Sequence, residues 1–304
     1  MPPPWTAREL PSELGPMFRV RDALDESAVT EARLRARDLD AGVWGMRSTD
    51  DLSGDLRGRC ELYAARLDQR AFFSHVTAAL LLGVVLPREI AARSDLHISL
   101  PAPHRAPHCA GLIGHQLRVA AGDVIVRDGL RLTSPARTWR DLASILSLPD
   151  LVAAGDRILW RKRPLASREL LQRALPTTPV RGSKNLRLAL PMLTDRADSA
   201  PESIVRAALV LAGMPAPEPN HEVPDPAAGH SWWVDLAYPA LGLAIEYQGD
   251  HHRDVAQWRD DLRRRARLEA LGWQVLELTG DDLRDLAALV RLIRERISRL
   301  SRRS

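Results

Sequence analysis

The stretch that decides the fold is Trp232-Trp233-Val234-Asp235-Leu236-Ala237-Tyr238, followed after a short turn by Leu243-Ala244-Ile245-Glu246-Tyr247-Gln248-Gly249. Two short apolar runs around a turn are typical of adjacent β-strands. Each run carries one carboxylate, and Asp235 and Glu246 are eleven residues apart, which suits facing positions on a hairpin. Buried carboxylates are costly unless they are paired or metal-bound. The pair therefore predicts a divalent-cation site.

The chemistry of two carboxylates favours a hard cation. Mg²⁺ prefers oxygen ligands and keeps several waters, so two carboxylates suffice, and Mn²⁺ is the alternative ion. Such an ion polarises a phosphoryl oxygen and lowers the pKa of an attacking water, as phosphodiester cleavage requires. We predict Asp235 and Glu246 as metal ligands, with Glu202 as a third carboxylate that starts a helix. The alternative for Glu202 is a favourable interaction with that helix N-terminus.

The surrounding sequence predicts the order αβββαβα and an α/β (α+β) fold with a mixed sheet. A helix over residues 199–213 precedes a short strand near 220–223 and the two carboxylate strands. A basic helix over 255–271, a strand over 273–278 and an amphipathic helix over 281–300 follow.

Several motifs in this region carry a resemblance to a known family. They are Pro201-Glu202-Ser203, Val234-Asp235-Leu236, Glu246-Tyr247-Gln248-Gly249-Asp250-His251-His252, Asp261 with Arg264, and Leu271-Gly272-Trp273-Gln274-Val275-Leu276. Over residues 199–300 the chain resembles the very-short-patch-repair endonuclease-like domains of the PD-(D/E)XK (restriction-endonuclease-like) superfamily. The resemblance implies a metal-dependent DNA endonuclease, acting in repair or defence, with DNA as its partner.

The third position of the superfamily motif departs from the usual pattern. Gln248 stands where the superfamily usually has a lysine, and no lysine follows Lys184. A glutamine carbonyl can coordinate a cation or orient water but cannot carry a positive charge. The resemblance favours His251 or His252 as a further site residue, because imidazole titrates near neutral pH and can move protons. A polar loop after a strand is the alternative for both.

The basic helix offers one candidate for nucleic-acid binding. Arg264 lies three residues after Asp261, so the two side chains share a helix face and can pair with each other. The alternative is that Arg264 contacts the substrate phosphate. For Arg263, Arg265 and Arg267 we expect a solvated face.

The N-terminal half predicts two further domains. Residues 1–55 form a small helical unit with a winged-helix-like start or, alternatively, a solvated helical cap. Residues 56–193 mix helices and strands, and the third domain covers 199–304. Ser134-Pro135-Ala136-Arg137-Thr138 and Asp141-Leu142-Ala143 look like the N-terminal part of actinobacterial proteins that carry this nuclease-like domain, and faintly like abortive-infection-type antitoxins. The resemblance implies DNA, a toxin or another protein as partner.

Composition limits the class of protein. The 304 residues are 45% hydrophobic and 27% charged, which is ordinary for a globular protein. The longest apolar run, residues 76–86, is too short to cross a membrane. Only two cysteines, Cys60 and Cys109, and no export signal at the N-terminus predict a cytoplasmic protein without membrane partners. The net charge of +4 is compatible with nucleic acid but does not demonstrate binding.

Other interpretations remain open. The missing lysine favours a non-catalytic DNA-binding antitoxin or transcription regulator with a degenerate nuclease fold, and an interaction scaffold is a third class. His104, His108, Cys109 and His115 are metal-ligand residue types, but their spacing matches no familiar zinc pattern.

Overall fold

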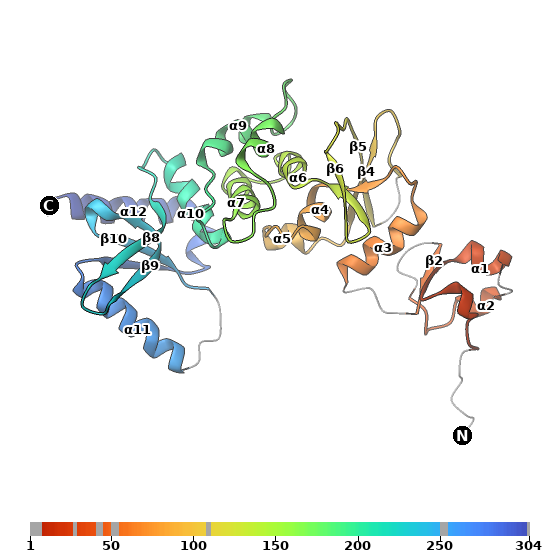
Figure 1. Ribbon diagram of the computed structural model, residues 1–304, viewed down its shortest axis with the longest axis horizontal. Coiled ribbons are helices and arrows are strands. Elements are labelled where there is room, and N and C mark those ends of the chain that lie inside the picture. Colours follow the sequence, from red (N-terminus) through yellow and green to blue (C-terminus); the bar gives the residue numbers. More distant parts are fainter. Residues whose placement is uncertain are drawn as a thin grey trace. The chain divides into compact units, whose positions relative to one another are not determined.

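The chain folds into mixed helices and strands, which confirms the predicted α/β class (Figure 1). The computed structural model describes residues 8–26, 29–40, 45–49, 55–107, 111–249 and 255–302. By their contacts the residues form two compact units. Unit 1 comprises Met1–Gly83 with Arg88–Ser134, and unit 2 comprises Val84–Pro87 with Pro135–Ser304. The three domains predicted from the sequence stay a prediction, because this division groups residues 135–193 with the C-terminal part.

Unit 1 begins with a small sheet and two short helices. The elements are η1 (Ser12–Leu14), β1 (Met17–Arg19), α1 (Val20–Glu26), α2 (Glu31–Leu34) and β2 (Met46–Ser48). β1 and β2 are antiparallel, and Phe18, Ala23 and Leu34 are in the core beneath them. The second helix of this unit, α2, has only four residues. Thr30 caps its start, and the chain turns after Leu34 before Asp40 pairs with Ser48.

The rest of unit 1 is a five-stranded sheet with helices. Its elements are α3 (Leu56–Arg66), β3 (Phe72–Phe73), α4 (His75–Leu81), α5 (Arg88–Ala91), β4 (Leu96–Pro101), β5 (Leu112–Leu117), β6 (Val124–Arg127) and β7 (Leu130–Thr133). The strand order is β5-β4-β3-β7-β6. β4 pairs with β5 in parallel and with β3 in antiparallel orientation, so the sheet is mixed.

Unit 2 begins with helices that pack onto the C-terminal sheet domain. They are α6 (Pro135–Leu142), α7 (Leu148–Leu159), α8 (Arg168–Arg173) and α9 (Ser183–Met192), followed by α10 (Ala200–Leu211). A buried polar network joins α7 to α10. Asp156 of α7 accepts hydrogen bonds from Ser203 Oγ at 2.7 Å and from Arg206 Nη2 at 2.6 Å. This network explains why residues 135–193 belong with the C-terminal region.

The C-terminal part of unit 2 has the predicted element order. After α10 come β8 (Glu218–Asp225), β9 (His230–Tyr238), η2 (Pro239–Leu241), β10 (Leu243–Tyr247), α11 (Val255–Ala270), β11 (Gln274–Leu278), η3 (Asp282–Arg284) and α12 (Leu286–Ser301). The strand order is β11-β10-β9-β8. β9 is antiparallel to both of its neighbours, β8 and β10. β10 and β11 are parallel, and α11 forms the crossover between them. Gly242 adopts a left-handed conformation (φ 57°) that closes the β9–β10 turn.

Two apolar cores cover the two faces of this sheet. Leu236, Leu243 and Ile245 pack with Leu209 of α10 and Ile293 of α12. On the other face, the core contains residues from β8, β9, β10, β11 and α11; these are Val223, Val234, Ala237, Ala244, Val275 and Leu268. Helices on both faces exclude water from most of the sheet, so polar groups on its strands are partly or fully desolvated.

The outer strand of this sheet, β8, contains two prolines. Pro219 pairs with Leu236 and Pro224 pairs with Ser231 of β9. Between them, Asn220 has a positive φ of 49°, a conformation that asparagine tolerates better than most residues. Among the described residues, no helix is long and apolar enough to span a lipid bilayer.

Candidate active site

The hairpin brings the two predicted metal ligands to the same end of two paired strands. β9 and β10 pair in a continuous register that ends at Leu236 opposite Ile245. Asp235 and Glu246 are the next residues along the two strands, beyond the last paired residues. Asp235 Oδ2 accepts a 2.8 Å hydrogen bond from the Tyr247 backbone N–H. The predicted hairpin is therefore present, whereas the facing positions of the two carboxylates and metal binding stay predictions.

Glu246 is buried and forms an ion pair with the basic helix. Its side chain is on the same side of β10 as α11, and Arg264 Nη1 donates a 3.0 Å hydrogen bond to Glu246 Oε2. Arg264 Nη2 lies 2.5 Å from Oε1 and also donates to the Trp233 carbonyl oxygen. Arg264 is half-buried, so the structure places it beside the carboxylates. The side chain of Asp261, its expected partner, lies outside the described residues.

Glu202 lies in the first turn of α10, as predicted, and is also buried. Ser199 caps this helix by accepting a hydrogen bond from the Glu202 backbone N–H, and Pro201 favours the first turn. Glu202 Oε2 in turn accepts a 3.0 Å hydrogen bond from the Asp198 backbone N–H. This reciprocal arrangement, similar to a capping box, fixes the carboxylate at the end of the sheet.

Asp235 is electrostatically coupled to both Glu202 and Glu246. Burial and the negative charge of Asp235 together raise the pKa of Glu202 to about 7. Burial also raises the pKa of Glu246 to about 7; Arg264 opposes this rise and Asp235 adds to it. The pKa of Asp235 is raised by burial, despite the Tyr247 hydrogen bond and the charge of Arg264. These groups would be easier to ionise beside an added cation.

Asp198 is a site residue that the sequence analysis missed. It precedes the helix cap, and its charge raises the pKa of both Glu202 and Asp235. Burial raises the pKa of Asp198 itself, but hydrogen bonds from Trp160 and Lys162 outweigh this effect and lower it. Asn220 Nδ2 donates a further 2.7 Å hydrogen bond to Asp198. The signal in the sequence was Asp-Ser-x-Pro-Glu, in which Asp198 reads as an ordinary residue before a cap.

Three of the predicted residues are less well defined by the structure. Gln248 follows β10 directly, and its backbone N–H donates a 2.7 Å hydrogen bond to the Leu278 carbonyl of β11. Its side chain is half-buried, and the residue directly follows the strand that carries Glu246. His251 and His252 lie outside the described residues, and their predicted roles remain predictions.

The other arginines of α11 whose side chains the structure describes have acidic partners within the protein. Arg263 pairs with Asp260, and Arg265 pairs with Glu269 and Glu277. Arg267 forms two 2.5 Å hydrogen bonds to Asp225, whose side chain is fully buried. The expectation of a solvated face fits Arg263 and Arg265, which are exposed, whereas Arg267 anchors α11 to β8.

The carboxylate site fits the hard cation that the resemblance implies. Among the described residues, Glu246 Oε1 is buried and accepts no hydrogen bond of good geometry, although Arg264 Nη2 lies near. Glu246 and its neighbours Asp235 and Glu202 present carboxylate oxygens, the donor type that Mg²⁺ and Mn²⁺ prefer. The donor type suits the predicted metal, but among the described residues these three carboxylates do not bring their oxygens within 4.8 Å of one another, so metal binding here stays a prediction.

Of the four metal-ligand residue types noted in the N-terminal half, the structure describes His104 and His115. His104 is exposed and contacts Arg70, whereas His108 and Cys109 lie outside the described residues. His115 instead joins His75 and His97 in unit 1. Spacing along the chain missed this trio because its members come from separate elements.

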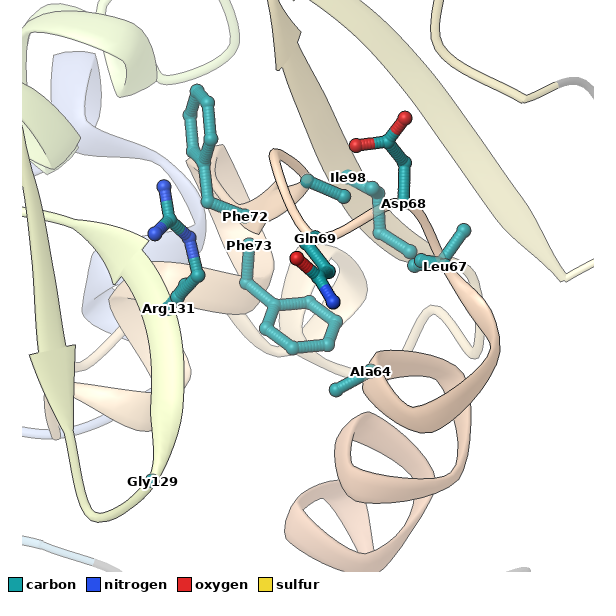
Figure 2. A pocket seen from close by; sticks show the side chains of 10 residues that line it. Ala64, Leu67, Asp68, Gln69, Phe72, Phe73, Ile98, Gly129 and Arg131 are labelled. Carbon is teal, nitrogen blue, oxygen red and sulfur yellow. The ribbon is translucent and has the colours of Figure 1, made fainter.

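Unit 1 also contains a pocket of about 240 Å³ whose residues include none of those predicted for the site. Figure 2 shows Arg131 and the two neighbouring phenylalanines Phe72 and Phe73 on one side, with Asp68 and Leu67 on the other. The walls are mostly apolar, and Asp68 is bound to Arg70. The pocket offers room for a small apolar group but no arrangement of catalytic side chains.

Comparison with known proteins places the chain in a family. No family model matches it. Two proteins of Mycobacterium tuberculosis strains, "Uncharacterized protein Rv2248" and "Uncharacterized protein MT2308", are each 32% identical over 231 residues, which cover 76% of this chain and 82% of each relative. The chain belongs to the family of these mycobacterial proteins.

A solved structure shows a more distant similarity. The RV2827C protein from Mycobacterium tuberculosis matches with a TM-score of 0.37 and 18% identity, over 60% of this chain and 71% of that one. This similarity is too low to assign a function.

Proposed function

We propose that the C-terminal part of unit 2 is a Mg²⁺-dependent DNA endonuclease of the type that the sequence resembles. The observation that supports this most is the electrostatic coupling of Asp235 to both Glu202 and Glu246, in buried surroundings that raise the pKa of each carboxylate. Buried like charges with raised pKa values cluster at functional sites more often than elsewhere.

In this proposal the residues of the chain have separate tasks. Asp235 and Glu246 would hold the ion, with the Gln248 carbonyl as a further ligand. When bound, the ion would polarise the scissile phosphate and activate water. Glu202, with a pKa of about 7, exchanges a proton near neutral pH and is suited to general acid–base catalysis. His251 or His252 is proposed for the same purpose.

Arg264 is proposed to supply the positive charge that Gln248 lacks. It lies on α11 rather than on the strand, and its guanidinium faces Glu246. A planar guanidinium binds phosphate oxygens as well as carboxylates. Once a cation balances Glu246, Arg264 has a donor to offer to the DNA phosphate. DNA, and a toxin or another protein bound through the N-terminal half, are the proposed partners.

The test is cleavage of supercoiled plasmid and branched DNA by the full chain with Mg²⁺ or Mn²⁺. Asp235→Asn keeps an acceptor for the Tyr247 N–H but removes the charge, so we expect about a thousandfold loss of rate. Glu218→Gln is the matched control, because Glu218 is an exposed carboxylate of the same sheet, and its rate should be unchanged. Equal rates for Asp235→Asn and the wild type would refute the assignment.

A second function is favoured by one specific observation. Arg264 already neutralises Glu246, and Gln248 replaces the usual lysine, as expected of a DNA-binding regulator that has lost catalysis. This alternative predicts metal-independent DNA binding, measured by fluorescence anisotropy, without cleavage under either cation. Asp235→Asn should then leave the affinity for DNA unchanged.

A further inference from the structure

Three histidines converge in unit 1, away from any role in the proposed nuclease. His75 begins α4, His97 lies on β4 and His115 lies on β5. One ring nitrogen from each lies within 4.8 Å of the other two. β4 and β5 are parallel neighbours in which Ser99 pairs with His115, so His97, two residues before Ser99, shares a face with His115. α4 brings the third ring to this face.

The distances between the rings approach those of a shared metal ion. His97 Nδ1 and His115 Nε2 are 3.0 Å apart. Two nitrogens bound to one tetrahedral Zn²⁺ at 2.0–2.1 Å are about 3.3 Å apart. The ring centroids of His97 lie 5.1 Å from His115 and 5.6 Å from His75, while His75 and His115 are stacked at 3.9 Å. An ion would replace the proton that His97 and His115 share, and would separate the stacked pair slightly.

The backbone of His75 is held in an unfavourable conformation. Its φ is 49°, a left-handed value that a residue with a β-carbon adopts rarely and at a cost of about 1 kcal/mol or more. Ser74, which precedes it, is in the N-cap position of α4 but makes no cap hydrogen bond with its side chain. Such local strain persists where the surrounding structure requires a side chain in a fixed place.

Hydroxyl groups position two members of the trio. One hydroxyl contacts the ring of His75, as the outer hydrogen-bond partner of a metal ligand does, and another binds the backbone of His97. Ser74 Oγ lies 2.8 Å from His75 Nδ1 and accepts a 2.6 Å hydrogen bond from Ser99 Oγ. When Nδ1 donates to this hydroxyl, Nε2 of His75 is left as the ligand atom. Thr77 Oγ1 accepts the His97 backbone N–H at 2.7 Å, which fixes β4 against α4.

Two members of the trio, His97 and His115, are kept neutral by burial, as metal ligation requires. His75 and His97 are buried, and His115 is half-buried. Burial lowers the pKa of His97 to about 4, with a further contribution from His115, and lowers the pKa of His115. All donors are imidazoles, which suit late first-row divalent ions better than Mg²⁺.

We propose that His75, His97 and His115 bind one Zn²⁺ ion that ties α4 to the β4–β5 edge of the sheet. Three imidazole ligands leave one position of a tetrahedral ion for a water molecule or a ligand. This site is chemically distinct from the carboxylate site, which is suited to hard cations, and the proposal is independent of nuclease activity.

The experiment measures Zn²⁺ binding to the full chain after chelator treatment, by isothermal titration calorimetry in excess Mg²⁺. All proteins carry Asp235→Asn so that the carboxylate site contributes little. We expect one strong Zn²⁺ site, weakened at least about 100-fold by His97→Gln or His115→Gln and about 10-fold by Ser74→Ala. His104→Gln, an exposed histidine of the same unit, is the matched control and should bind Zn²⁺ like its parent.

A measurement on the parent protein covers the case in which a histidine variant does not fold. X-ray absorption of the Zn²⁺-loaded protein should show three imidazoles in the first shell, and Co²⁺ should give the visible absorption of a four-coordinate ion. Absence of a strong site, binding that survives both histidine substitutions, or a shell with fewer than two imidazoles would overturn the proposal.

Discussion

Neighbouring residues of α10 meet two different groups of buried carboxylates, one around Asp156 and one around Asp235. Ser203 and Arg206 face Asp156, which receives these two side chains and the Thr194 backbone N–H, so its charge is balanced. Glu202, next to Ser203, instead faces Asp235 and the site. Burial raises the pKa of Asp156 as it does those of the site carboxylates, so the contrast lies in their partners. A buried arginine faces Asp156, whereas Glu202 faces the negative charge of Asp235, which raises its pKa.

This difference separates residues that stabilise the fold from residues that cost stability. A carboxylate with a full set of partners holds two helices together and contributes no reactivity. A carboxylate whose pKa is raised by a neighbouring carboxylate as well as by burial makes the folded state less stable at neutral pH, and such a cost is retained where function needs it. Four experiments test this contrast, and six of the eight tryptophans lie in unit 2, so their fluorescence reports on it.

The largest effect is expected from Asp156→Ala. Removing this carboxylate leaves Arg206 buried without its partner, which typically costs about 3–5 kcal/mol of unfolding free energy. Urea denaturation would measure the loss. Glu295→Ala, which breaks an exposed pair with Arg299, is the control and should cost less than about 1 kcal/mol. If the two variants were equally stable, the Asp156 network would not be structural.

Glu202→Gln is expected to raise the free energy of unfolding, whereas Asp156→Ala lowers it. The unfolded glutamate loses its proton near pH 4.5, whereas the folded one keeps it to about pH 7. Between these values the unfolded state binds fewer protons, so the wild type loses stability as pH rises. The variant should match the wild type near pH 4.5 and exceed it at pH 8 by up to about 3 kcal/mol.

The pH series of urea denaturation for Glu202→Gln has its own control. Glu218→Gln removes an exposed carboxylate of the same sheet and should show no comparable gain at any pH. A Glu202→Gln variant that is less stable than the wild type at pH 8 would mean that this carboxylate stabilises the fold.

A smaller gain in the stability of the folded state is expected from added Mg²⁺. An ion that binds only the folded state raises its stability by about 1.4 kcal/mol when free Mg²⁺ is about ten times its Kd. Because protons compete for Glu202 and Glu246, the rise in Tm should be larger at pH 8 than at pH 5.5. It should disappear in Asp235→Asn. An equal rise at both pH values would indicate binding elsewhere.

The last experiment concerns Asn220, which links β8 to Asp198. Asn220→Ala loses the hydrogen bond to Asp198 and places alanine at a φ of 49°, so we expect a loss of about 1–3 kcal/mol. Asn220→Gly loses the same hydrogen bond without the backbone strain and should cost less. Thermal unfolding of the two variants separates the contributions, and equal losses would assign the whole effect to the side chain.

The sequence predicted the parts of the site that depend on local spacing. The hairpin and its register followed from two apolar runs and a turn, so the placement of Asp235 and Glu246 at the same end of two paired strands was accessible. The contact of Arg264 with Glu246 was not, because helical spacing reveals only neighbours within one helix, such as Asp261. His75, His97 and His115 come from a helix start and two strands, and no periodic pattern joins such distant positions. Asp156 likewise acquired its role through packing between α7 and α10.

The prolines of β8 have a consequence for how this protein meets other chains. A proline has no N–H, and in a sheet it is tolerated where that N–H would have pointed to solvent. Pro219 and Pro224 therefore interrupt the outward row of donors along the free side of β8. A foreign strand would find too few hydrogen-bond partners to lengthen the sheet there. The prolines therefore disfavour edge-to-edge aggregation through β8.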